Sequence, residues 1–338
     1  MGVTMAKILL TGGAGYIGSH TYLALVEAGF EVVILDNFSN AKPDVPARLQ
    51  DISGGMVHVF EGDVLNPQDL EDVFAAHSLD GVVHFAALKA VGESVQKPLD
   101  YMHTNVGGLL NLLAAMDKAQ VRRIVFSSSA TVYGDTDIQP IPENHPRTFT
   151  SPYAYTKIAG EQILEQLPED WAVGILRYFN PVGAHRSALI GEDPEDMPNN
   201  LVPYLAKVAT GDLAELAVFG DDYPTPDGTG VRDYIHVEDL ADGHVLSLNT
   251  LLETGKNHTV NLGTGKGSTV LDVVRAYSDA CGRDLPYRIV PRRAGDVAVL
   301  TARPEQAKAT LGFEAKRSLA DMCQSSWAWV SGQRRNSS

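Results

Sequence analysis

A tyrosine and a lysine at helical spacing are the first candidates for chemistry in this sequence. Tyr153 and Lys157 lie in the segment Tyr-Ala-Tyr-Thr-Lys, which opens a predicted helix after a proline-rich loop. At this spacing both side chains share one helix face, whereas Tyr155 lies on another. A free phenol has a pKa near 10 and is a poor base at neutral pH, but an adjacent ammonium favours its ionised form. We therefore assign Tyr153 as a base and Lys157 as its activating cation, although such a pair also arises by chance in many helices.

A run of serines supplies a third catalytic candidate. Ser127, Ser128 and Ser129 end a predicted strand, and no carboxylate lies between Ser127 and Gly134. A hydroxyl at this point can bind the same substrate oxygen as the tyrosine, donating or accepting a hydrogen bond as the proton moves. We assign this role to Ser129.

A glycine-rich segment separates the first predicted strand from the first predicted helix. Gly12, Gly15 and Gly18 have the spacing GxxGxxG, a close variant of the dinucleotide fingerprint, which brings a pyrophosphate to the N-terminus of a helix. The triplet alone also fits an ordinary tight turn. Asp36 ends the next strand, where a carboxylate accepts hydrogen bonds from a ribose 2′-OH and repels a 2′-phosphate. We therefore expect NAD rather than NADP.

The nicotinamide ring of NAD⁺ adds a second positive charge near Tyr153. Lowering the pKa of a phenol by about three units takes roughly 4 kcal/mol, which two cations in a partly dry site can supply. Further strand ends fit the same cofactor. Asp63 can lie beside the adenine, or can simply cap the helix that begins at Pro67. The small residues of segment 85–89 suit a backbone that passes close to a cofactor.

Short apolar runs rich in Val and Ile alternate with helical patterns in the first half of the chain. The runs are at 7–10, 31–35, 57–60, 81–85, 123–126 and 172–176. The helical patterns are at 16–28, 67–76, 99–119 and 153–167. Such runs are typical of parallel strands buried on both faces, and their alternation with helices predicts an α/β fold with a doubly wound parallel (Rossmann-type) sheet.

The pattern changes after about residue 178. Segments 181–203 and 220–230 are dense in Pro, Gly, Asp and Asn, and further helices are predicted at 237–252, 269–281 and 319–330. We expect an NAD-binding domain over residues 1–178. A smaller mixed α/β domain over 179–338 would bind the substrate, with some segments returning to the first domain.

Composition limits the class of protein. The 338 residues allow about two domains, and the net charge of −15 argues against partners such as nucleic acid or an anionic membrane. Cys281 and Cys323 have no metal-binding spacing, so no metal is expected. No apolar run reaches the roughly 18 residues of a membrane span, and the N-terminal apolar run is too short for a signal peptide. We therefore expect a cytoplasmic protein.

The combination of glycine loop, Asp36, Ser129, Tyr153 and Lys157 resembles the extended short-chain dehydrogenase/reductases. Longer strings narrow the resemblance to the UDP-glucose 4-epimerase family and extend it over about residues 6–330. These strings are HFAALKAVGESVQKP at 84–98, LRYFNPVGAH at 176–185, PNNL at 198–201 and DGTGVRDYIH at 227–236.

The resemblance implies interconversion of UDP-glucose and UDP-galactose without net redox change. Tyr153 would take the proton of the sugar 4-OH while the C4 hydride passes to tightly held NAD⁺. The 4-keto sugar would then turn over and receive the hydride on its other face. Members of the family usually form homodimers, here through the helices at 99–119 and 153–167, although amphipathic helices equally suit a monomer.

The resemblance also implies which residues bind each ligand. It places NAD on Gly12, Gly15, Tyr16, Ile17, Gly18, Asp36, Asn37, Phe38, Ser39, Asn40, Ala41, Asp63, Val64, Phe85, Ala86, Ala87, Leu88, Lys89, Thr104, Asn105, Ser129, Tyr153, Lys157 and Phe179. It places the UDP-sugar on Ser129, Tyr153, Asn180, Asn200, Leu201, Ala217, Val218, Phe219, Arg232, Arg293, Asp296 and Leu300. Arg232 and Arg293 would bind the diphosphate, a geometry that suits guanidinium groups.

Two positions depart from the family pattern. Many members have Asn-Asn where this chain has Thr104-Asn105, which puts the first of these cofactor contacts in question. Leu300 stands where forms restricted to UDP-glucose and UDP-galactose commonly have Tyr, and where forms that accept N-acetylated sugars have a smaller residue. Activity on UDP-GlcNAc and UDP-GalNAc therefore stays open.

Other functions fit these residues less well. The 4,6-dehydratases and UDP-glucuronate decarboxylases of the superfamily tend to carry a carboxylate within the serine segment, and this chain carries none there. An NAD-sensing scaffold would have no need for Ser129, Tyr153 and Lys157 together. A net dehydrogenase would require exchangeable NAD and would consume it in proportion to product.

Overall fold

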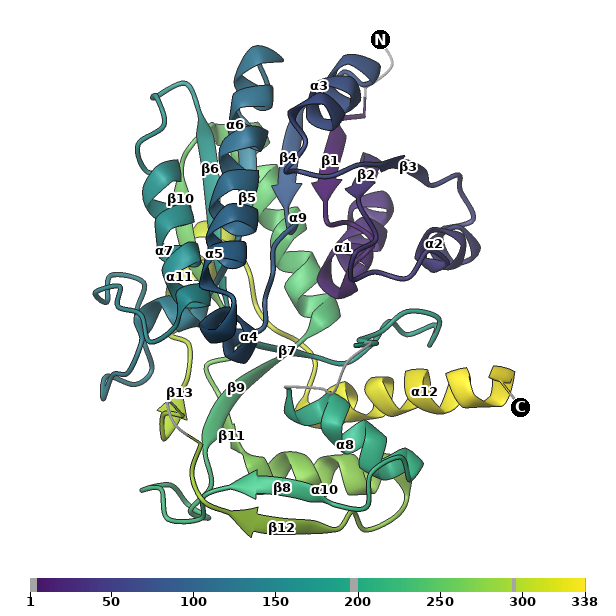
Figure 1. Cartoon of the computed structure of the whole chain (residues 1–338), viewed down its shortest axis with the longest axis vertical. Coiled ribbons are helices and arrows are strands. Elements are labelled where there is room, and N and C mark those ends of the chain that lie inside the picture. Colours follow the sequence, from purple (N-terminus) through teal and green to yellow (C-terminus); the bar gives the residue numbers. More distant parts are fainter. Residues whose placement is uncertain (1–4, 195–199, 294–295, 338) are drawn as a thin grey trace.

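The computed structural model describes residues 5–194, 200–293 and 296–337, which form a large and a small lobe (Figure 1). The large lobe is built on a seven-stranded sheet in the order β10-β6-β5-β4-β1-β2-β3, and all neighbouring strands are parallel. Its strands are β1 (Lys7–Thr11), β2 (Glu31–Asp36), β3 (His58–Glu61), β4 (Gly81–His84), β5 (Arg123–Ser129), β6 (Ala172–Tyr178) and β10 (His258–Leu262). The predicted doubly wound parallel sheet is confirmed.

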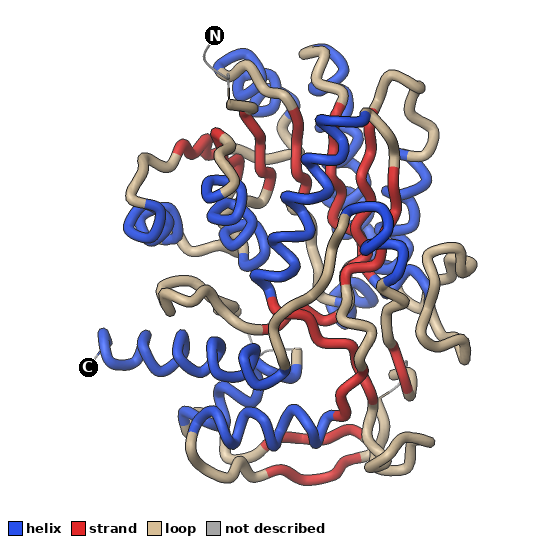
Figure 2. Tube along the Cα trace, turned by 180° about the vertical axis from the view of Figure 1, so that it is seen from behind, coloured by secondary structure: helices blue, strands red, loops and turns tan. Residues whose placement is uncertain are grey.

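Helices cover both faces of this sheet (Figure 2), because its strands are apolar on both sides. Along β1, Ile8 and Leu10 pack into one core and Leu9 packs into the other, as the two-residue period of a strand requires. One face is covered by α1 (Tyr16–Glu27), α2 (Val45–Ser53), α9 (Val237–Thr254) and α11 (Glu305–Leu311). The other is covered by α3 (Pro67–Ala76), α6 (Gly108–Lys118) and α7 (Pro152–Leu164).

The small lobe contains two further sheets, seen below the large one in Figure 1. One consists of β7 (Asn180–Val182), β9 (Val231–His236), β11 (Gly267–Thr269) and β13 (Val299–Leu300), and the other pairs β8 (Leu216–Phe219) with β12 (Tyr287–Val290). Their core is shared with α8 (Leu201–Thr210), α10 (Val270–Cys281) and α12 (Leu319–Ser337).

The two lobes interleave along the chain. After β9, the segment α9–β10 returns to the large lobe, where β10 pairs with β6 in parallel. Later, α11 packs against the same core as α9. The domain boundary at residue 178 stays a prediction, but each lobe draws on several stretches of the second half of the chain.

The helix predicted at 99–119 is divided in the structure, which corrects that prediction. Two short helices, α4 (Val91–Gln96) and α5 (Pro98–Tyr101), precede a π-helical turn, η1 (Met102–Gly107), and only then does α6 begin. Such turns occur frequently at functional sites. The sequence analysis did not predict α2, although Val45, Leu49 and Ile52 have helical spacing, because only Leu49 of this short helix is buried.

Neither a spanning helix nor a cysteine pair is seen in the described part of the chain. None of the helices there is both long and apolar enough to cross a membrane. Cys281 and Cys323 are both free thiols.

Candidate active site

The glycine-rich turn between β1 and α1 packs directly against the segment that follows β4. Gly12 has a φ of 70°, in the left-handed region that favours glycine. A Cβ atom at Gly12 would lie 2.7 Å from the backbone nitrogen of Ala86, and one at Gly18 would overlap the carbonyl oxygen of Gly12. Gly12 and Gly18 are therefore both required by close contacts with backbone atoms. An ordinary tight turn would not need glycine at both positions.

The N-terminus of α1 and Asp36 together fit a dinucleotide. The N-cap of α1 is Gly15, and no described side chain accepts a hydrogen bond from this helix end, whose first N–H groups have no partner within the helix. Asp36 accepts hydrogen bonds from the backbone nitrogens of Ala14 and Phe38, each at 2.9 Å. Burial raises the pKa of Asp36 and these two bonds lower it. Both carboxylate oxygens keep a lone pair with which they can bind a ribose hydroxyl.

Asp63 does not cap the helix that follows it. The N-cap of α3 is Asn66, whose side chain accepts a hydrogen bond from the backbone nitrogen of Gln68. Asp63 instead accepts hydrogen bonds from the side chain of Asn37, at 2.9 Å, and from the backbone nitrogen of Leu65, at 2.8 Å. It thus joins the ends of β2 and β3, and the helix-cap alternative is wrong.

The segment after β4 is clamped from two sides. Phe85 and Ala86 donate backbone hydrogen bonds to the carbonyl oxygen of Thr11, at 2.9 and 3.0 Å. On the other side, the Asn105 amide exchanges bonds of 2.8 and 3.0 Å with the backbone of Leu88. Its nitrogen also donates to Thr156, at 3.0 Å. Asn105 therefore holds this segment and α7 together.

The remaining residues predicted to bind NAD lie at the same edge of the large sheet, because the carboxyl ends of parallel strands meet there. Those after β2 are Asn37, Phe38, Ser39, Asn40 and Ala41; those after β3 and β4 are Val64, Ala87 and Lys89; Thr104 lies on η1, Phe179 follows β6, and Tyr16 and Ile17 open α1. Their contacts with NAD stay predictions.

Tyr153, Lys157 and Ser129 come together between α7 and the end of β5. The ammonium of Lys157 lies 5.8 Å from the ring centre of Tyr153 and donates a hydrogen bond of 2.7 Å to the carbonyl oxygen of Ser127. Tyr153 and Lys157 are both buried, whereas Tyr155 is 42% exposed. The expected separation of the two tyrosines onto different helix faces is thus confirmed.

The groups of the protein by themselves do not lower the pKa of Tyr153 below its ordinary value. Burial raises the pKa of Tyr153 to about 12, and its hydrogen bond with Ser129 lowers it only in part. Burial also lowers the pKa of Lys157 to about 8, although the charge of Glu161 opposes this. The protein side chains alone therefore do not make Tyr153 a base at neutral pH, and a further positive charge is needed beside the phenol.

Glu161 and Arg177 form a buried pair beside these residues that the sequence analysis missed. The guanidinium of Arg177 donates to both carboxylate oxygens of Glu161, at 2.9 and 2.7 Å. Arg177 is only 4% exposed. A signal was present, because Arg177 directly follows the predicted apolar run 172–176, and a charged residue near the end of a buried strand needs a buried partner.

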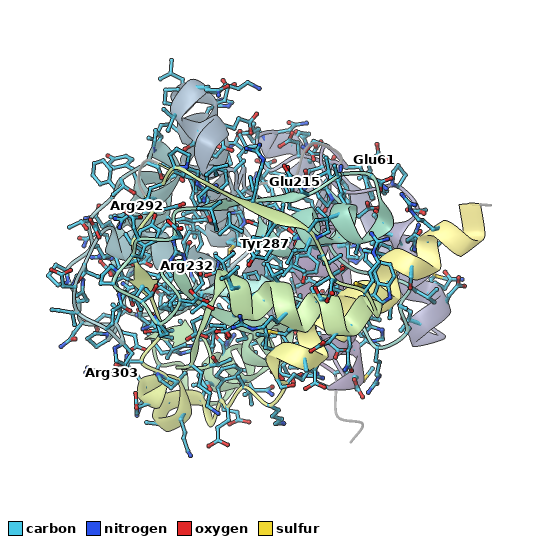
Figure 3. All side chains as sticks on the ribbon, turned by 90° about the horizontal axis from the view of Figure 1, so that it is seen from below. Glu61, Glu215, Arg232, Tyr287, Arg292 and Arg303 are labelled. Carbon is cyan, nitrogen blue, oxygen red and sulfur yellow. The ribbon has the colours of Figure 1, made fainter. Side chains whose placement is uncertain are left out.

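A second group of predicted residues surrounds β9 in the small lobe. Asp296 accepts two hydrogen bonds from Arg293, at 3.1 and 3.0 Å, and lies 3.9 Å from a guanidinium nitrogen of Arg232. Arg293 also lies over the ring of Phe219, 5.4 Å from its centre. Figure 3 shows Arg232 from below, on the same side of the small lobe as Arg292 in that view. Two cations and an exposed aromatic ring are thus brought to one place.

The other residues predicted to bind the UDP-sugar are reached from neighbouring strands. Leu300 on β13 pairs with Arg232, and Asn180 on β7 pairs with Tyr234 of the same central strand. Ala217 and Val218 lie on β8, and Leu201 opens α8. Pro198 and Asn199 of the PNNL string lie outside the described residues.

A carboxylate that the sequence analysis did not select lies between the two groups. Glu192 accepts a hydrogen bond of 3.1 Å from Asn200 and lies 3.8 Å from the ammonium of Lys89. Burial raises the pKa of Glu192, while Lys89 and Asn200 lower it. Glu192 thus links a residue predicted to bind NAD with one predicted to bind the sugar nucleotide.

Comparison with known proteins places this architecture among enzymes. The sequence model of the NAD dependent epimerase/dehydratase family matches residues 8–263. The UDP-glucose 4-epimerase of Bacillus subtilis (strain 168) is 52% identical over 327 residues, which are 96% of this chain and 96% of that protein.

Solved structures agree over nearly the whole length. The UDP-glucose 4-epimerase of Stenotrophomonas maltophila, crystallised with NAD and formylated UDP-arabinopyranose, superposes with a TM-score of 0.96 at 47% identity, covering 98% of this chain and 99% of that one. The enzyme of Bifidobacterium longum, in complex with NAD⁺ and UDP, gives a TM-score of 0.93 at 47% identity, covering 97% and 99%. Both lobes therefore have counterparts in each of these structures.

Proposed function

Because the chain belongs to the NAD dependent epimerase/dehydratase family, and within it to the UDP-glucose 4-epimerases, we propose that it interconverts UDP-galactose and UDP-glucose by transient oxidation at sugar C4. The observation that carries this proposal is the buried Tyr153, with the ammonium of Lys157 5.8 Å from its ring centre, at the sheet edge that bears the glycine turn. The reaction is an isomerisation, so NAD is regenerated in each turnover.

The residues of the large lobe suit NAD. The pyrophosphate would meet the first turn of α1 at Tyr16 and Ile17, and Asp36 would bind the adenosine ribose. Asp63, joined to Asn37, would lie at the adenine end. When bound, NAD⁺ would supply the acceptor for the hydride that leaves C4 of the sugar. It would also supply a positive charge beside Tyr153.

Tyr153 would carry the proton of the sugar 4-OH. Lys157 contributes one positive charge to the phenol, and the positive nicotinamide contributes the second, which together oppose the effect of burial. Ser129 would share the same substrate oxygen, donating a hydrogen bond as that oxygen becomes a carbonyl. Because Tyr153 returns the proton to the rotated sugar, the residue is ready for the next turnover without exchange with solvent.

Arg232, Arg293 and Phe219 support a nucleoside diphosphate as the ligand of the small lobe. The two guanidinium groups suit a diphosphate, and the exposed ring of Phe219 suits a stacked base. The contacts of Arg293 with Asp296 would be shared with the incoming ligand. The UDP portion would thus stay bound while the sugar turns over.

The environment of Glu161 supports an epimerase rather than a dehydratase or decarboxylase. Glu161 contacts Ser128 and is the carboxylate seen next to the serine segment among the described residues. Arg177 and Arg147 hold both of its oxygens, and although burial raises the pKa of Glu161, these bonds lower it further than burial raises it. It stays ionised and paired, so it is unsuited to the additional proton transfer that an elimination needs.

The direct test uses purified protein without added cofactor. We expect UDP-galactose to be converted to UDP-glucose, and the same mixture to be reached from UDP-glucose, when nucleotide sugars are separated by anion-exchange chromatography. Bound NAD is measured after denaturation. Failure of both conversions with NAD bound would contradict the proposal, and accumulation of NADH in proportion to product would indicate a net dehydrogenase.

The sugar preference is tested with UDP-GlcNAc and UDP-GalNAc in the same assay. Leu300 lies on β13 beside Arg232, where a larger side chain would fill space near the sugar. We expect Leu300→Tyr to lower the rate with N-acetylated sugars relative to that with UDP-galactose. An unchanged ratio of the two rates would show that Leu300 does not set this preference.

A homodimer fits the exposed apolar residues of one helical region. Large hydrophobic side chains are exposed on α4, α5 and α7, which pack against one another, and also on α6 and in the loop before α7. Exposed apolar side chains that gather on one surface mark an interaction site. They are Val91, Val95, Leu99, Leu110, Phe149 and Tyr155. The most exposed is Leu99, at 79%. A second copy of the chain is therefore proposed to cover this region.

Replacement of Leu99 tests the dimer. We expect Leu99→Asp to convert a dimer into monomers, because a charge would be buried in an apolar interface, and sedimentation velocity would show the change in mass. Met56→Asp is the matched control, since Met56 is 76% exposed but lies after α2. A monomeric wild-type protein, or a dimer in Leu99→Asp, would contradict the assignment.

A cytoplasmic location and the lack of nucleic-acid or membrane partners stay predictions. They rest on the net charge of −15, on two cysteines that are too few for a disulfide framework, and on the lack of an apolar run of about 18 residues. Fractionation of cells with an antibody against the chain would test the location.

A further inference from the structure

A buried carboxylate, that of Glu161, lies next to the proposed catalytic residues. Glu161 lies on α7, one helical turn after Lys157, and its side chain is fully buried. Arg177 of β6 donates to both of its oxygens, and Arg147 donates to one at 3.0 Å. The hydroxyl of Ser128 donates to it as well. One carboxylate thus joins α7, β5, β6 and the loop before α7.

The hydrogen bond from Ser128 to Glu161 lies between the strand residue that contacts Lys157 and the one that lies near Tyr153. Ser128 stands between Ser127, whose carbonyl oxygen accepts the 2.7 Å bond from Lys157, and Ser129, whose hydroxyl is near enough to Tyr153 to lower the pKa of the phenol. Glu161 therefore fixes the strand end on which the lysine and the tyrosine both rely. The close packing of α7 on β5 has the same effect, because a Cβ atom at Gly160 would lie 2.6 Å from the ring of Phe126.

The groups that face the Lys157 ammonium come from three elements. Tyr153 and Glu161 lie on its own helix, His84 faces it from β4, and the aromatic ring of Phe126 on β5 lies 5.2 Å from the ammonium. Burial and the charge of Lys157 lower the pKa of His84 to about 3, so this ring is neutral.

Glu161 supplies the negative charge that Lys157 experiences. Arg177 and Arg147 lie behind Glu161 and contact its carboxylate. Burial lowers the pKa of Lys157 to about 8, and Glu161 is the group that opposes this. Without Glu161, both cations would remain close by: Arg147 would keep Glu165 as a carboxylate partner, whereas Arg177 would lose the carboxylate that it contacts.

We propose that Glu161 is a positioning residue of the active site, which holds the 127–129 strand end against α7 and keeps the Lys157 amine charged while Tyr153 moves its proton. The proposal rests on the proposed function in assigning this work to Tyr153. The juxtaposition of Glu161, Ser128 and Lys157 is independent of the substrate.

The test titrates Lys157 directly in the purified protein. Lysine is labelled with ¹³C, and the signal of Lys157 is identified by its loss in Lys157→Met. We expect Glu161→Gln to lower the ratio of charged to neutral Lys157 at least about tenfold at a given pH, which is one pKa unit. Glu161→Asp keeps the charge, so it should titrate close to wild type. The matched control is Glu165→Gln, one turn further at the C-cap of α7, which removes an exposed partner of Arg147.

The outcomes are distinct. A wild-type titration of Lys157 in folded Glu161→Gln would overturn the proposal, and so would an equal change in Glu165→Gln. Glu161→Gln leaves Arg177 buried without its partner, which is strongly destabilising. If that variant does not fold, Glu161→Gln/Arg177→Met removes both charges, and the remaining cation Arg147 should still lower the pKa of Lys157, by less than the single change would.

The pH dependence of the rate provides a second readout. Lys157 is charged below its pKa and neutral above it, so activity should fall on the alkaline side. In Glu161→Gln this fall should move to lower pH, while Glu161→Asp should lower the rate without moving it. If the wild-type protein does not act on UDP-galactose, the proposed function fails, and the titration still decides the role of Glu161.

Discussion

Tyr153→Phe is expected to lower the rate of UDP-galactose conversion by about 10²- to 10⁴-fold, the range typical of a lost acid–base group. The side chain of Tyr153, on α7, is buried, so phenylalanine keeps the packing and removes only the hydroxyl. The variant should therefore still contain NAD and still bind UDP. Stopped reactions resolved by chromatography measure the rate, and calorimetry measures UDP binding.

Tyr155→Phe is the matched control for this prediction. Tyr155 lies on the same helix but points away, is 42% exposed and contacts the ring of Phe149 at 5.1 Å between centres. Its rate should equal that of the wild type. A Tyr153→Phe protein with nearly full activity would show that another group removes the proton.

Gly12→Ala is expected to abolish NAD retention and to destabilise the large lobe. The new Cβ atom would lie 2.7 Å from the nitrogen and 3.0 Å from the Cα of Ala86, both of which are backbone atoms that cannot move aside cheaply. The positive φ of 70° adds a left-handed cost of about 1–2 kcal/mol. The measurements are NAD content after gel filtration and unfolding in urea.

Gly29→Ala separates the effect of the positive φ from the effect of the close contact with Ala86. Gly29 also has a positive φ, of 89°, but a Cβ atom there meets no described atom within 4 Å. It should lose about 1–2 kcal/mol of stability and keep its NAD. Equal NAD content in the two variants would mean that the glycine turn does not need its close contact with Ala86.

Local patterns in the sequence predicted much of the large lobe. The helix predicted at 67–76 is observed as α3 with these bounds, and the strands predicted at 7–10 and 31–35 each extend by one residue. These elements follow from hydrogen bonds and side-chain periods within a few residues. The shared face of Tyr153 and Lys157 is of the same kind, since it depends only on helical geometry.

Other features depend on residues far apart in the chain. The break at η1 accompanies the bonds of Asn105 to Leu88 and Thr156, and Arg177 meets Glu161 only when β6 lies beside β5. No periodic pattern reports such contacts. The same is true of Asp63, whose partner Asn37 belongs to the neighbouring strand end.

The sequence by itself determined the strand–helix alternation, the glycine turn with Asp36, and the helix that carries Tyr153 and Lys157, because each is written in residues close to one another. Only the tertiary structure decided the electrostatics of the site. Burial raises the pKa of Tyr153 and lowers that of Lys157, and Glu161 acts against the second effect. A pKa depends on exclusion of water and on charges brought together from separate elements, and both exist only after the lobes have packed.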